Sequence, residues 1–163
     1  MQLLNPLQIQ QKTERIAIEI LEHNYAETDI ILAGINNNGR RFAERLQAVL
    51  ERRAPHIMFT SAHLRINPAA PTATPATIDI AAADLANKTL ILIDDVANTG
   101  RTIHYALLPL LTVLMKKVEV AVLIDRKHKS FPVQPDYIGL SLATTIQADI
   151  AVDLGENEGV FLH

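Results

Sequence analysis

The sequence predicts an α/β protein with one central, mainly parallel sheet flanked by helices. Short apolar runs that suit buried strands alternate along the chain with helical segments, and this order is typical of parallel strands joined by right-handed crossovers. The length of 163 residues and the hydrophobic content of 48% suit one compact domain with a core and are too small for two. We therefore expect residues 1–163 to form a single domain.

The first third of the chain predicts a helix, and then a strand, a turn and a second helix. Apolar residues spaced three and four apart mark an amphipathic helix over residues 7–23. Residues 29–34 form a short apolar run typical of a buried strand, and the polar residues 35–39 after it predict a turn. We expect a helix over residues 40–53 and a further strand over residues 56–61.

The next segment is rich in proline and small residues. Residues 67–76 contain three prolines, which preclude both a helix and a central strand there. A long loop inside a compact domain is usually functional, and a lid over an active site is the commonest case. We therefore expect residues 62–79, with about this extent, to form a flexible lid loop.

The second half of the chain continues the alternation. We expect a buried strand over residues 89–93, a polar segment over residues 94–102, and a helix over residues 103–115 that Pro109 should kink. The remaining expected strands, which should complete the sheet, cover residues 118–124, 137–142 and 150–154.

The composition excludes several kinds of function. The chain has no cysteine, which rules out disulfides, thiolate nucleophiles and sulfur-ligated metals, and its six histidines lack the spacing of a metal site. The net charge of −3 gives no general attraction to nucleic acid or to anionic membranes. Because we find neither a signal peptide nor an apolar segment of about 18 residues, we expect a cytoplasmic protein without membrane contact.

Two carboxylates and a phosphate-binding pattern follow the strand expected at residues 89–93. The carboxyl ends of parallel strands line the ligand crevice of an open sheet, so Asp94 and Asp95 should reach that crevice. Residues 98–102 add consecutive backbone N–H groups, two hydroxyls and a glycine at the start of a helix. Taken alone, the two aspartates would fit a purely structural role, as a polar strand end or a helix cap, as well as they fit a ligand site. The whole pattern predicts a ligand with a phosphate beside a diol or a metal, such as ribose 5-phosphate.

Residues 90–102 resemble the signature with which type I phosphoribosyltransferases bind 5-phosphoribosyl-1-pyrophosphate, abbreviated PRPP. Residues 121–129, 131–133 and 136–139 further resemble the pyrimidine operon attenuator and uracil phosphoribosyltransferase family, and the resemblance covers nearly the whole chain. It implies the type I phosphoribosyltransferase fold with a small hood and a flexible active-site loop. It also implies Mg²⁺ as cofactor, PRPP and a pyrimidine base as ligands, and a homodimer or higher homo-oligomer.

The resemblance also implies roles for individual residues. Asp94, Asp95 and Arg65 would be the catalytic residues: the two aspartates would bind the ribose hydroxyls, directly or through Mg²⁺ and water, and the Arg65 region would close over the site with the lid. The 5-phosphate would be held by Ala97, Asn98, Thr99, Gly100, Arg101 and Thr102. The pyrophosphate would be held by Asn37, Asn38, Gly39 and Arg40, and the base would be bordered by Asp125, Arg126, Tyr137 and Ile138.

Two single residues and one three-residue stretch depart from the patterns of relatives. Asn98 stands where purine-specific relatives have an acidic residue, and Asp125 stands where they have a lysine, so a pyrimidine is the expected base. Residues 36–38 are three asparagines where the family usually presents a basic residue to the pyrophosphate. Arg40 and Arg41 are the candidates to replace that basic residue, and an ordinary solvated turn is the alternative interpretation of the asparagines.

Two functions of different classes fit these observations. The first is an enzyme that makes UMP and pyrophosphate from uracil and PRPP, with a related enzyme for another base as a variant. The second is a regulator of pyrimidine genes that binds leader RNA, with a nucleotide or PRPP as effector, and the arginine-rich helix over residues 40–53 motivates it. Glu44 and Glu51 interrupt those arginines, and only 4% of the residues are aromatic. Because the net charge is also negative and Ile18 stands in a helix face where RNA-binding relatives are more polar, we rank RNA binding second.

Overall fold

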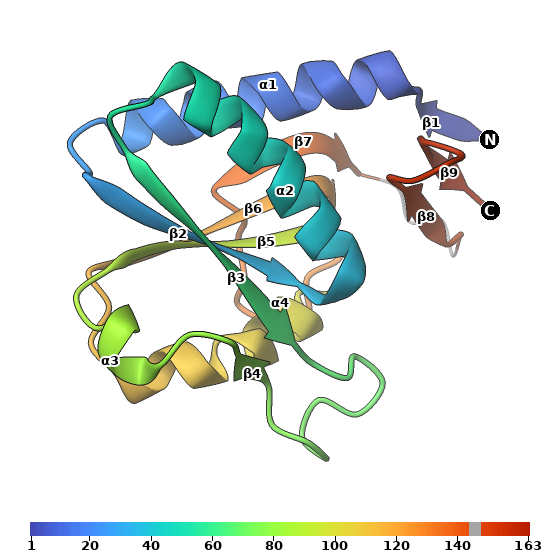
Figure 1. The fold of residues 1–163 in the computed structure, drawn as a ribbon. Helices are drawn as coiled ribbons and strands as arrows, with labels where there is room; N and C mark the ends of the chain where they lie inside the picture. The colour runs from blue at the N-terminus through green and yellow to red at the C-terminus, as the bar shows by residue number, and fades with distance from the viewer. Residues whose placement is uncertain (144–147) are drawn as a thin grey trace.

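The computed structural model describes residues 1–143 and 148–163, and its centre is a six-stranded sheet (Figure 1). In spatial order its strands are β4 (Thr77–Ile78), β3 (Met58–Arg65), β2 (Asp29–Ile35), β5 (Thr89–Ala97), β6 (Lys117–Arg126) and β7 (Tyr137–Leu142). Neighbouring strands are parallel except β4, which pairs with β3 antiparallel. The expected α/β fold with a mainly parallel sheet is confirmed.

Helices cover both faces of this sheet. Figure 1 shows α1 (Pro6–His23) and α2 (Asn36–Arg53) on one face, and α3 (Ala82–Leu85) and α4 (Arg101–Ala106) on the other. A short 3-10 helix, η1 (Leu108–Thr112), follows α4. Helix α1 starts at Pro6 because Asn5 and Gln8 form a reciprocal capping box, with both hydrogen bonds 2.9 Å long.

The core is divided between the two faces by the alternation of strand side chains. In β5, Ile91 and Ile93 pack in the core under α1 and α2, whereas Leu90 and Leu92 pack in the core under α3 and α4. All four side chains are fully buried. A strand that is apolar on both faces is typical of the centre of a parallel sheet, and this is why the sequence shows β5 as an unbroken apolar run.

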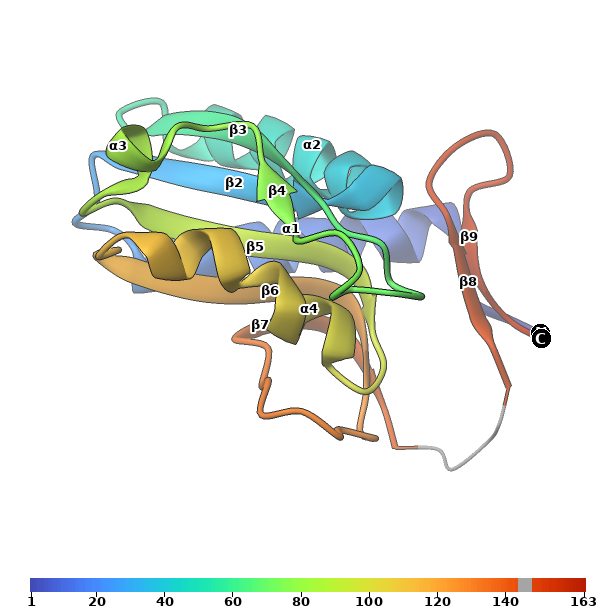
Figure 2. The ribbon, with the colours of Figure 1, turned by 90° about the horizontal axis from the view of Figure 1, so that it is seen from below.

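A second, three-stranded antiparallel sheet forms a hood at one end of the molecule. Its order is β1 (Gln2–Leu4), β9 (Gly159–Leu162) and β8 (Ile150–Asp153), and Figure 2 shows β8 and β9 set apart from the central sheet. The amino group of Met1 donates a hydrogen bond of 2.8 Å to the Leu162 carbonyl, so the two chain ends meet here.

The expectation that residues 150–154 complete the central sheet is therefore wrong. Only Val152 of β8 is buried, and such one-sided burial is typical of an antiparallel strand with one face in solvent. The small hood implied by the family resemblance is present.

Several boundaries differ from those expected. The polar residues 36–39 are the first turn of α2 and not a loop, and β5 continues through Asp94 and Asp95 to Ala97. Helix α4 starts at Arg101 and ends at Ala106, because Pro109 lies in the first turn of η1 and breaks the helix where a kink was expected.

The expected lid is shorter than residues 62–79. Its first four residues belong to β3 and residues 77–78 form β4, so the irregular connection covers residues 66–76. Figure 2 shows this connection projecting toward the hood, at the end of the sheet where β5 leads into α4. Within the part of the chain that the structure describes, no helix is both long and apolar enough to span a bilayer.

The order of the strands creates a crevice between β2 and β5. The chain continues from β2 outward to β3, and from β5 outward in the opposite direction to β6 and β7. In an open parallel sheet, ligands bind at the carboxyl ends of the two strands where the order reverses. The residues after β2 and at the end of β5 therefore face the same crevice.

We predict that Gly39→Ala destabilises the fold, although alanine is the better helix former by about 1 kcal/mol. A Cβ at position 39 would lie 2.6 Å from the carbonyl oxygen of Ile93 and 3.3 Å from the Cα of Asp94, so α2 would have to move away from β5. Overpacking of this kind costs about 1–3 kcal/mol. Urea unfolding should show a net loss of about 1 kcal/mol.

Gly155→Ala is the matched control, because its Cβ would meet only side-chain atoms, of Asp153 at 3.2 Å and of Arg41 at 3.8 Å, at an exposed position. Equal stability of Gly39→Ala and wild type would contradict the close contact between α2 and β5.

Candidate active site

A pocket of about 460 Å³ lies at the crevice between β2 and β5. Four parts of the chain contribute to it: the end of β2 with the first turn of α2, the β3–β4 connection, the end of β5 with the start of α4, and the hood. Its lining residues are Ile35, Asn36, Asn37, Asn38, Pro68, Asp94, Asp95, Val96, Asn98, Thr102 and Ile150.

Two adjacent carboxylates differ in their surroundings. Asp94 is 7% exposed, and its Oδ1 accepts a hydrogen bond of 2.9 Å from the N–H of Asp95. Burial raises the pKa of the Asp94 carboxyl well above its ordinary range, and the neighbouring Asp95 carboxylate raises it further. Asp95 is half-buried and accepts hydrogen bonds from the Val96 N–H at 2.9 Å and the Asn38 amide at 3.0 Å.

The three asparagines at the start of α2 have three different environments. Asn36 has φ of +52°, a left-handed conformation that asparagine tolerates, and its side chain pairs with both backbone groups of Ile66, at 2.9 and 3.0 Å. Asn37 is exposed and lines the pocket. The Asn38 side-chain amide donates a hydrogen bond to Asp95. The asparagines are thus neither a loop nor a solvated turn.

The segment expected to hold a phosphate turns sharply into α4. Gly100 has φ of +84°, and a Cβ there would lie 3.2 Å from the Cβ of Val133, so glycine is required both by conformation and by space. The hydroxyl of Thr99 accepts a hydrogen bond of 3.3 Å from the Arg101 N–H. The Arg101 guanidinium donates a hydrogen bond of 2.6 Å to the carbonyl of Pro68, which joins this segment to the β3–β4 connection.

A second cavity of about 470 Å³ adjoins the first and contains Arg65. The two cavities share Asn36 and Asn37. Arg65 is exposed, and its Nε donates to Nδ1 of the buried His63 at 3.4 Å. Arg40 is exposed and forms an ion pair of 3.3 Å with Glu44. Arg65 is therefore brought next to the pocket of the aspartates, whereas Arg40 faces solvent.

The residues expected to border the base are separated. Asp125 and Arg126 lie at the carboxyl end of β6, where Asp125 pairs with Lys129 at 2.5 Å and Arg126 donates to the Ala148 carbonyl at 2.8 Å. Both side chains are buried. Neither lines the pocket of the aspartates.

Tyr137 and Ile138 lie near the opposite end of the sheet, which corrects the expectation from the sequence. Tyr137 is paired in register with Ala121, four residues before Asp125, a separation of about 13 Å along the strand. Its hydroxyl donates to Glu119 at 2.8 Å and accepts from Asn24 at 3.3 Å. Burial and the Glu119 carboxylate raise the pKa of Tyr137, so this phenol stays protonated. The hydrogen bond between Tyr137 and Glu119 is therefore a buried structural contact.

Lys129 lies next to the segment expected to hold the phosphate, and the sequence did not single it out. Besides Asp125, its ammonium group contacts the backbone carbonyls of Ala97 and Asn98. The spacing of four residues between Asp125 and Lys129 was the available signal, but an acidic and a basic residue at that spacing are common on solvated surfaces.

Among the residues that line the pocket, Asp94 and Asp95 carry the carboxylates that could hold a divalent cation. No group of three or more His, Asp or Glu residues suited to a metal occurs in residues 1–143 and 148–163. Carboxylate oxygens are the ligands that Mg²⁺ prefers, and a bound cation would favour the ionised form of Asp94, whose pKa is raised in its absence. This donor set fits a cation that keeps most of its ligands from water or substrate.

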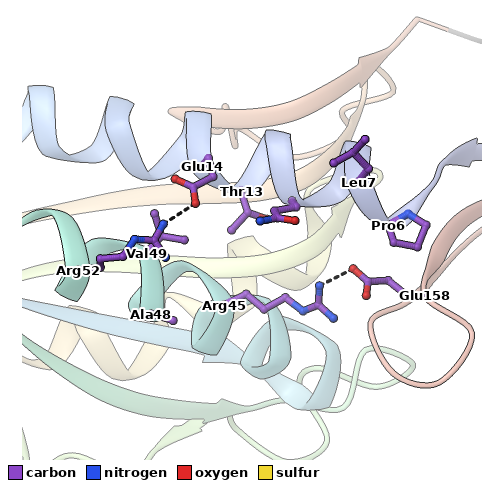
Figure 3. A pocket seen from close by; sticks show the side chains of 10 residues that line it. Pro6, Leu7, Thr13, Glu14, Arg45, Ala48, Val49, Arg52 and Glu158 are labelled. Atoms are coloured by element: carbon purple, nitrogen blue, oxygen red, sulfur yellow. Dashed lines mark hydrogen bonds and ion pairs between the residues drawn. The ribbon is translucent and has the colours of Figure 1, made fainter.

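Another cavity, of about 450 Å³, lies between α1, α2 and the β8–β9 turn (Figure 3). Figure 3 shows Arg45 directed to Glu158 and Arg52 directed to Glu14, with ion-pair distances of 2.5 Å in both cases. Arg53 also contacts Glu14, and the two arginines lower the pKa of this carboxyl. The positive charge of α2 is thus largely compensated by ion pairs, one within the helix and the others with neighbouring elements.

Comparison with known protein families agrees with this geometry. The family model described as phosphoribosyl transferase domain matches residues 1–156. The chain belongs to this family and is a type I phosphoribosyltransferase.

Within the family, the chain is similar to proteins named bifunctional protein PyrR. The relative from Halalkalibacterium halodurans is 35% identical over 97% of this chain and 92% of its own length. The relative from Streptomyces coelicolor is also 35% identical, over 89% of this chain and 78% of its own length.

Solved structures of other phosphoribosyltransferases share the fold. The hypoxanthine phosphoribosyltransferase of Trypanosoma cruzi superposes with a TM-score of 0.82, at 13% identity, over 99% of this chain and 94% of its own. A hypoxanthine-guanine phosphoribosyltransferase of Bacillus anthracis gives 0.73 at 17% identity, over 86% of this chain and 81% of its own.

We predict that Asp94→Asn stabilises the ligand-free protein at neutral pH. A raised carboxyl pKa means that the folded state binds the proton more tightly than the unfolded state, so this group's contribution to stability is greatest at low pH and falls as pH rises above the ordinary aspartate pKa. Asparagine removes this loss. At about pH 8 the free energy of unfolding of the variant should be about 1 kcal/mol larger than that of wild type, and its Tm about 2–4 °C higher. At about pH 3.5 both differences should vanish.

The half-buried Asp95→Asn serves as comparison, since no such gain is expected there. If Asp94→Asn were less stable than wild type at pH 8, the buried carboxylate would be a net stabilising group, contrary to this prediction.

Proposed function

We propose that this phosphoribosyltransferase transfers the phosphoribosyl group of PRPP to uracil, with UMP and pyrophosphate as products. The observation that carries the proposal is the junction of β5 and α4, where two acidic side chains and a glycine-containing turn at a helix start open into one pocket. A ribose 5-phosphate has a diol and a phosphate that match these two halves. The relatives named PyrR support a pyrimidine as the base.

In this proposal Asp94 and Asp95 bind the ribose hydroxyls. The exposed Asn98 and Thr99, with Gly100 and the first residues of α4, hold the 5-phosphate through backbone N–H groups and hydroxyls. The proposed base lies near Asn98 and the hood residue Ile150, which line the same pocket.

The pyrophosphate is proposed to occupy the neighbouring cavity. Asn37 connects the two cavities, and Arg65 supplies the positive charge that residues 36–38 lack. Gly39 lets the first turn of α2 approach β5, so that the N–H groups of this turn are near the leaving group. Arg40, which is exposed and paired with Glu44, is a weaker candidate.

The reaction needs positioning and charge stabilisation more than covalent chemistry. A base nitrogen displaces pyrophosphate from the anomeric carbon while positive charge develops on the ribose, and the acidic pair below the ring stabilises that charge. Bound Mg²⁺, held by Asp94 and Asp95 directly or through water and mainly by substrate oxygens, would neutralise charge on the departing pyrophosphate. The β3–β4 connection would exclude water that hydrolyses PRPP.

The proposal predicts Mg²⁺-dependent release of pyrophosphate from PRPP in the presence of uracil. Orotate, cytosine, hypoxanthine and a reaction without base should be assayed in parallel, together with a calorimetric titration of PRPP. Asp95→Asn should keep the fold, because the residue is half-buried, and should weaken PRPP binding by about 10-fold or more.

Asp84→Asn, in an exposed position on α3, is the matched control and should bind PRPP as wild type does. Release with another base would change the substrate and keep the site. Absence of PRPP binding by the wild type would overturn the proposal.

A second candidate function is regulation of pyrimidine genes through leader RNA, and the word bifunctional in the relatives' names favours it. The ion pairs of Arg40, Arg45 and Arg52 leave α2 a poor polyanion surface. The turn after β6 is more suitable, since Lys127 and His128 are exposed beside the proposed site.

If this function is present, affinity for a structured pyrimidine leader RNA should fall steeply with salt, with a slope of about −0.7 in log K against log salt for each phosphate contacted by the chain. Lys127→Ala should make that slope shallower by about 0.7, the contribution of one phosphate contact. If no RNA binding is detected at low salt, or if the affinity does not change with salt, this candidate function is excluded.

A further inference from the structure

Lys129 occupies an unusual position beneath the segment expected to hold the 5-phosphate. Its ammonium group lies 2.5 Å from Oδ1 of Asp125, 2.5 Å from the Arg126 carbonyl, 3.1 Å from the Asn98 carbonyl and 3.5 Å from the Ala97 carbonyl. The Lys129 side chain is 19% exposed and that of Asp125 only 3%. One cation thus connects the end of β6 with the turn that follows β5.

The residues after Lys129 bind the same turn from the same side. The backbone N–H groups of Ser130 and Phe131 both donate to the Thr99 carbonyl, at 2.9 and 3.2 Å. Gly100 packs on this segment too, since a Cβ there would approach Val133 to 3.2 Å and the Lys129 side chain to 3.5 Å. Three consecutive carbonyls, at positions 97, 98 and 99, are therefore held by residues 129–131.

The direction of these carbonyls fixes the direction of the N–H groups that follow them. In a trans peptide the C=O of one residue and the N–H of the next point in opposite directions, and no cis peptide occurs in the described chain. With the carbonyls of residues 97–99 turned toward Lys129 and its neighbours, the N–H groups of Asn98, Thr99 and Gly100 are directed away from them. Asn98 and Thr102, on either side of the turn, line the pocket.

We propose that Lys129 is a positioning residue for substrate binding: it holds the carbonyls of Ala97 and Asn98 so that the following N–H groups face the ligand phosphate. The inference rests on the proposed function, because it assumes that residues 97–102 bind the 5-phosphate of PRPP. Lys129 itself does not touch the ligand in this proposal. Asp125 keeps the ammonium group in place and balances its charge, which is why a carboxylate is buried there.

Lys129→Met tests the proposal, because methionine keeps an unbranched side chain only one atom shorter and removes the charge and the donors. We expect the Kd for PRPP with Mg²⁺ to rise by about 10- to 100-fold, the range that follows from the loss of one or two charge-assisted hydrogen bonds. In steady-state assays the KM for PRPP should rise while the KM for uracil changes by less than about 3-fold. If Lys129 had only a structural role, the substitution would not raise the KM for PRPP selectively over the KM for uracil.

Two further variants separate positioning from stability. Lys116→Met, at an exposed position just before the amino end of β6, removes a positive charge without these contacts and should bind PRPP within about 2-fold of wild type. The double variant Asp125→Asn with Lys129→Met removes the uncompensated buried carboxylate, so it should unfold close to the wild-type midpoint and still bind PRPP weakly.

The outcomes are distinct. If the double variant regained wild-type PRPP affinity, Lys129 would serve only to neutralise Asp125, and the positioning role would be overturned. Wild-type affinity in Lys129→Met would overturn it as well. If the wild type did not bind PRPP, the proposed function would fail, and this inference would fail with it.

Discussion

The close approach of the first turn of α2 to the end of β5 is the constraint on which the site depends. Gly39 makes it possible, because any side chain there would meet the Ile93 carbonyl. The approach lets the Asn38 amide reach Asp95, and it leaves Asn36 free to hold Ile66 at the end of β3. One backbone contact at the switch point thus fixes the ends of three strands relative to one another, and the pocket is the space between them.

Asp94 shows that this arrangement is not optimised for the stability of the ligand-free chain. A buried carboxyl beside a second carboxylate is unfavourable at neutral pH, although it accepts a hydrogen bond from the neighbouring N–H of Asp95. A ligand that brings hydroxyl donors or a cation to this position relieves the penalty, so binding to the folded state also stabilises it. Sites of this kind commonly depart from the local rules that the rest of a sequence obeys.

The sequence predicted those parts of the fold that depend on local pattern. The bounds of β7 and the start of β5 were correct, and α1 was correct to within one residue, because strand and helix periodicities are visible along the chain. The sheet predicted for β8 was wrong, since an apolar run does not reveal which strand it pairs with. Tyr137 was misplaced for a different reason: a parallel strand starts at the amino edge of the sheet, so its first residue lies far from the carboxyl edge where ligands bind. The position of Lys129 could not be predicted, because it depends on contacts with residues about 30 positions away, which no periodicity encodes.

The β3–β4 connection is held unequally at its two points of contact with the site. At its base, two half-buried hydrogen bonds tie Ile66 to Asn36, whereas nearer its tip a single bond from the exposed Arg101 side chain reaches Pro68. An exposed hydrogen bond contributes about 1 kcal/mol or less, so the tip can detach at little cost while the base stays fixed. Arg65 belongs to β3 and precedes that base, so it does not depend on the position of the tip. In the proposed function this arrangement lets the connection open and close over the ligand while the charge that faces the pyrophosphate stays in place.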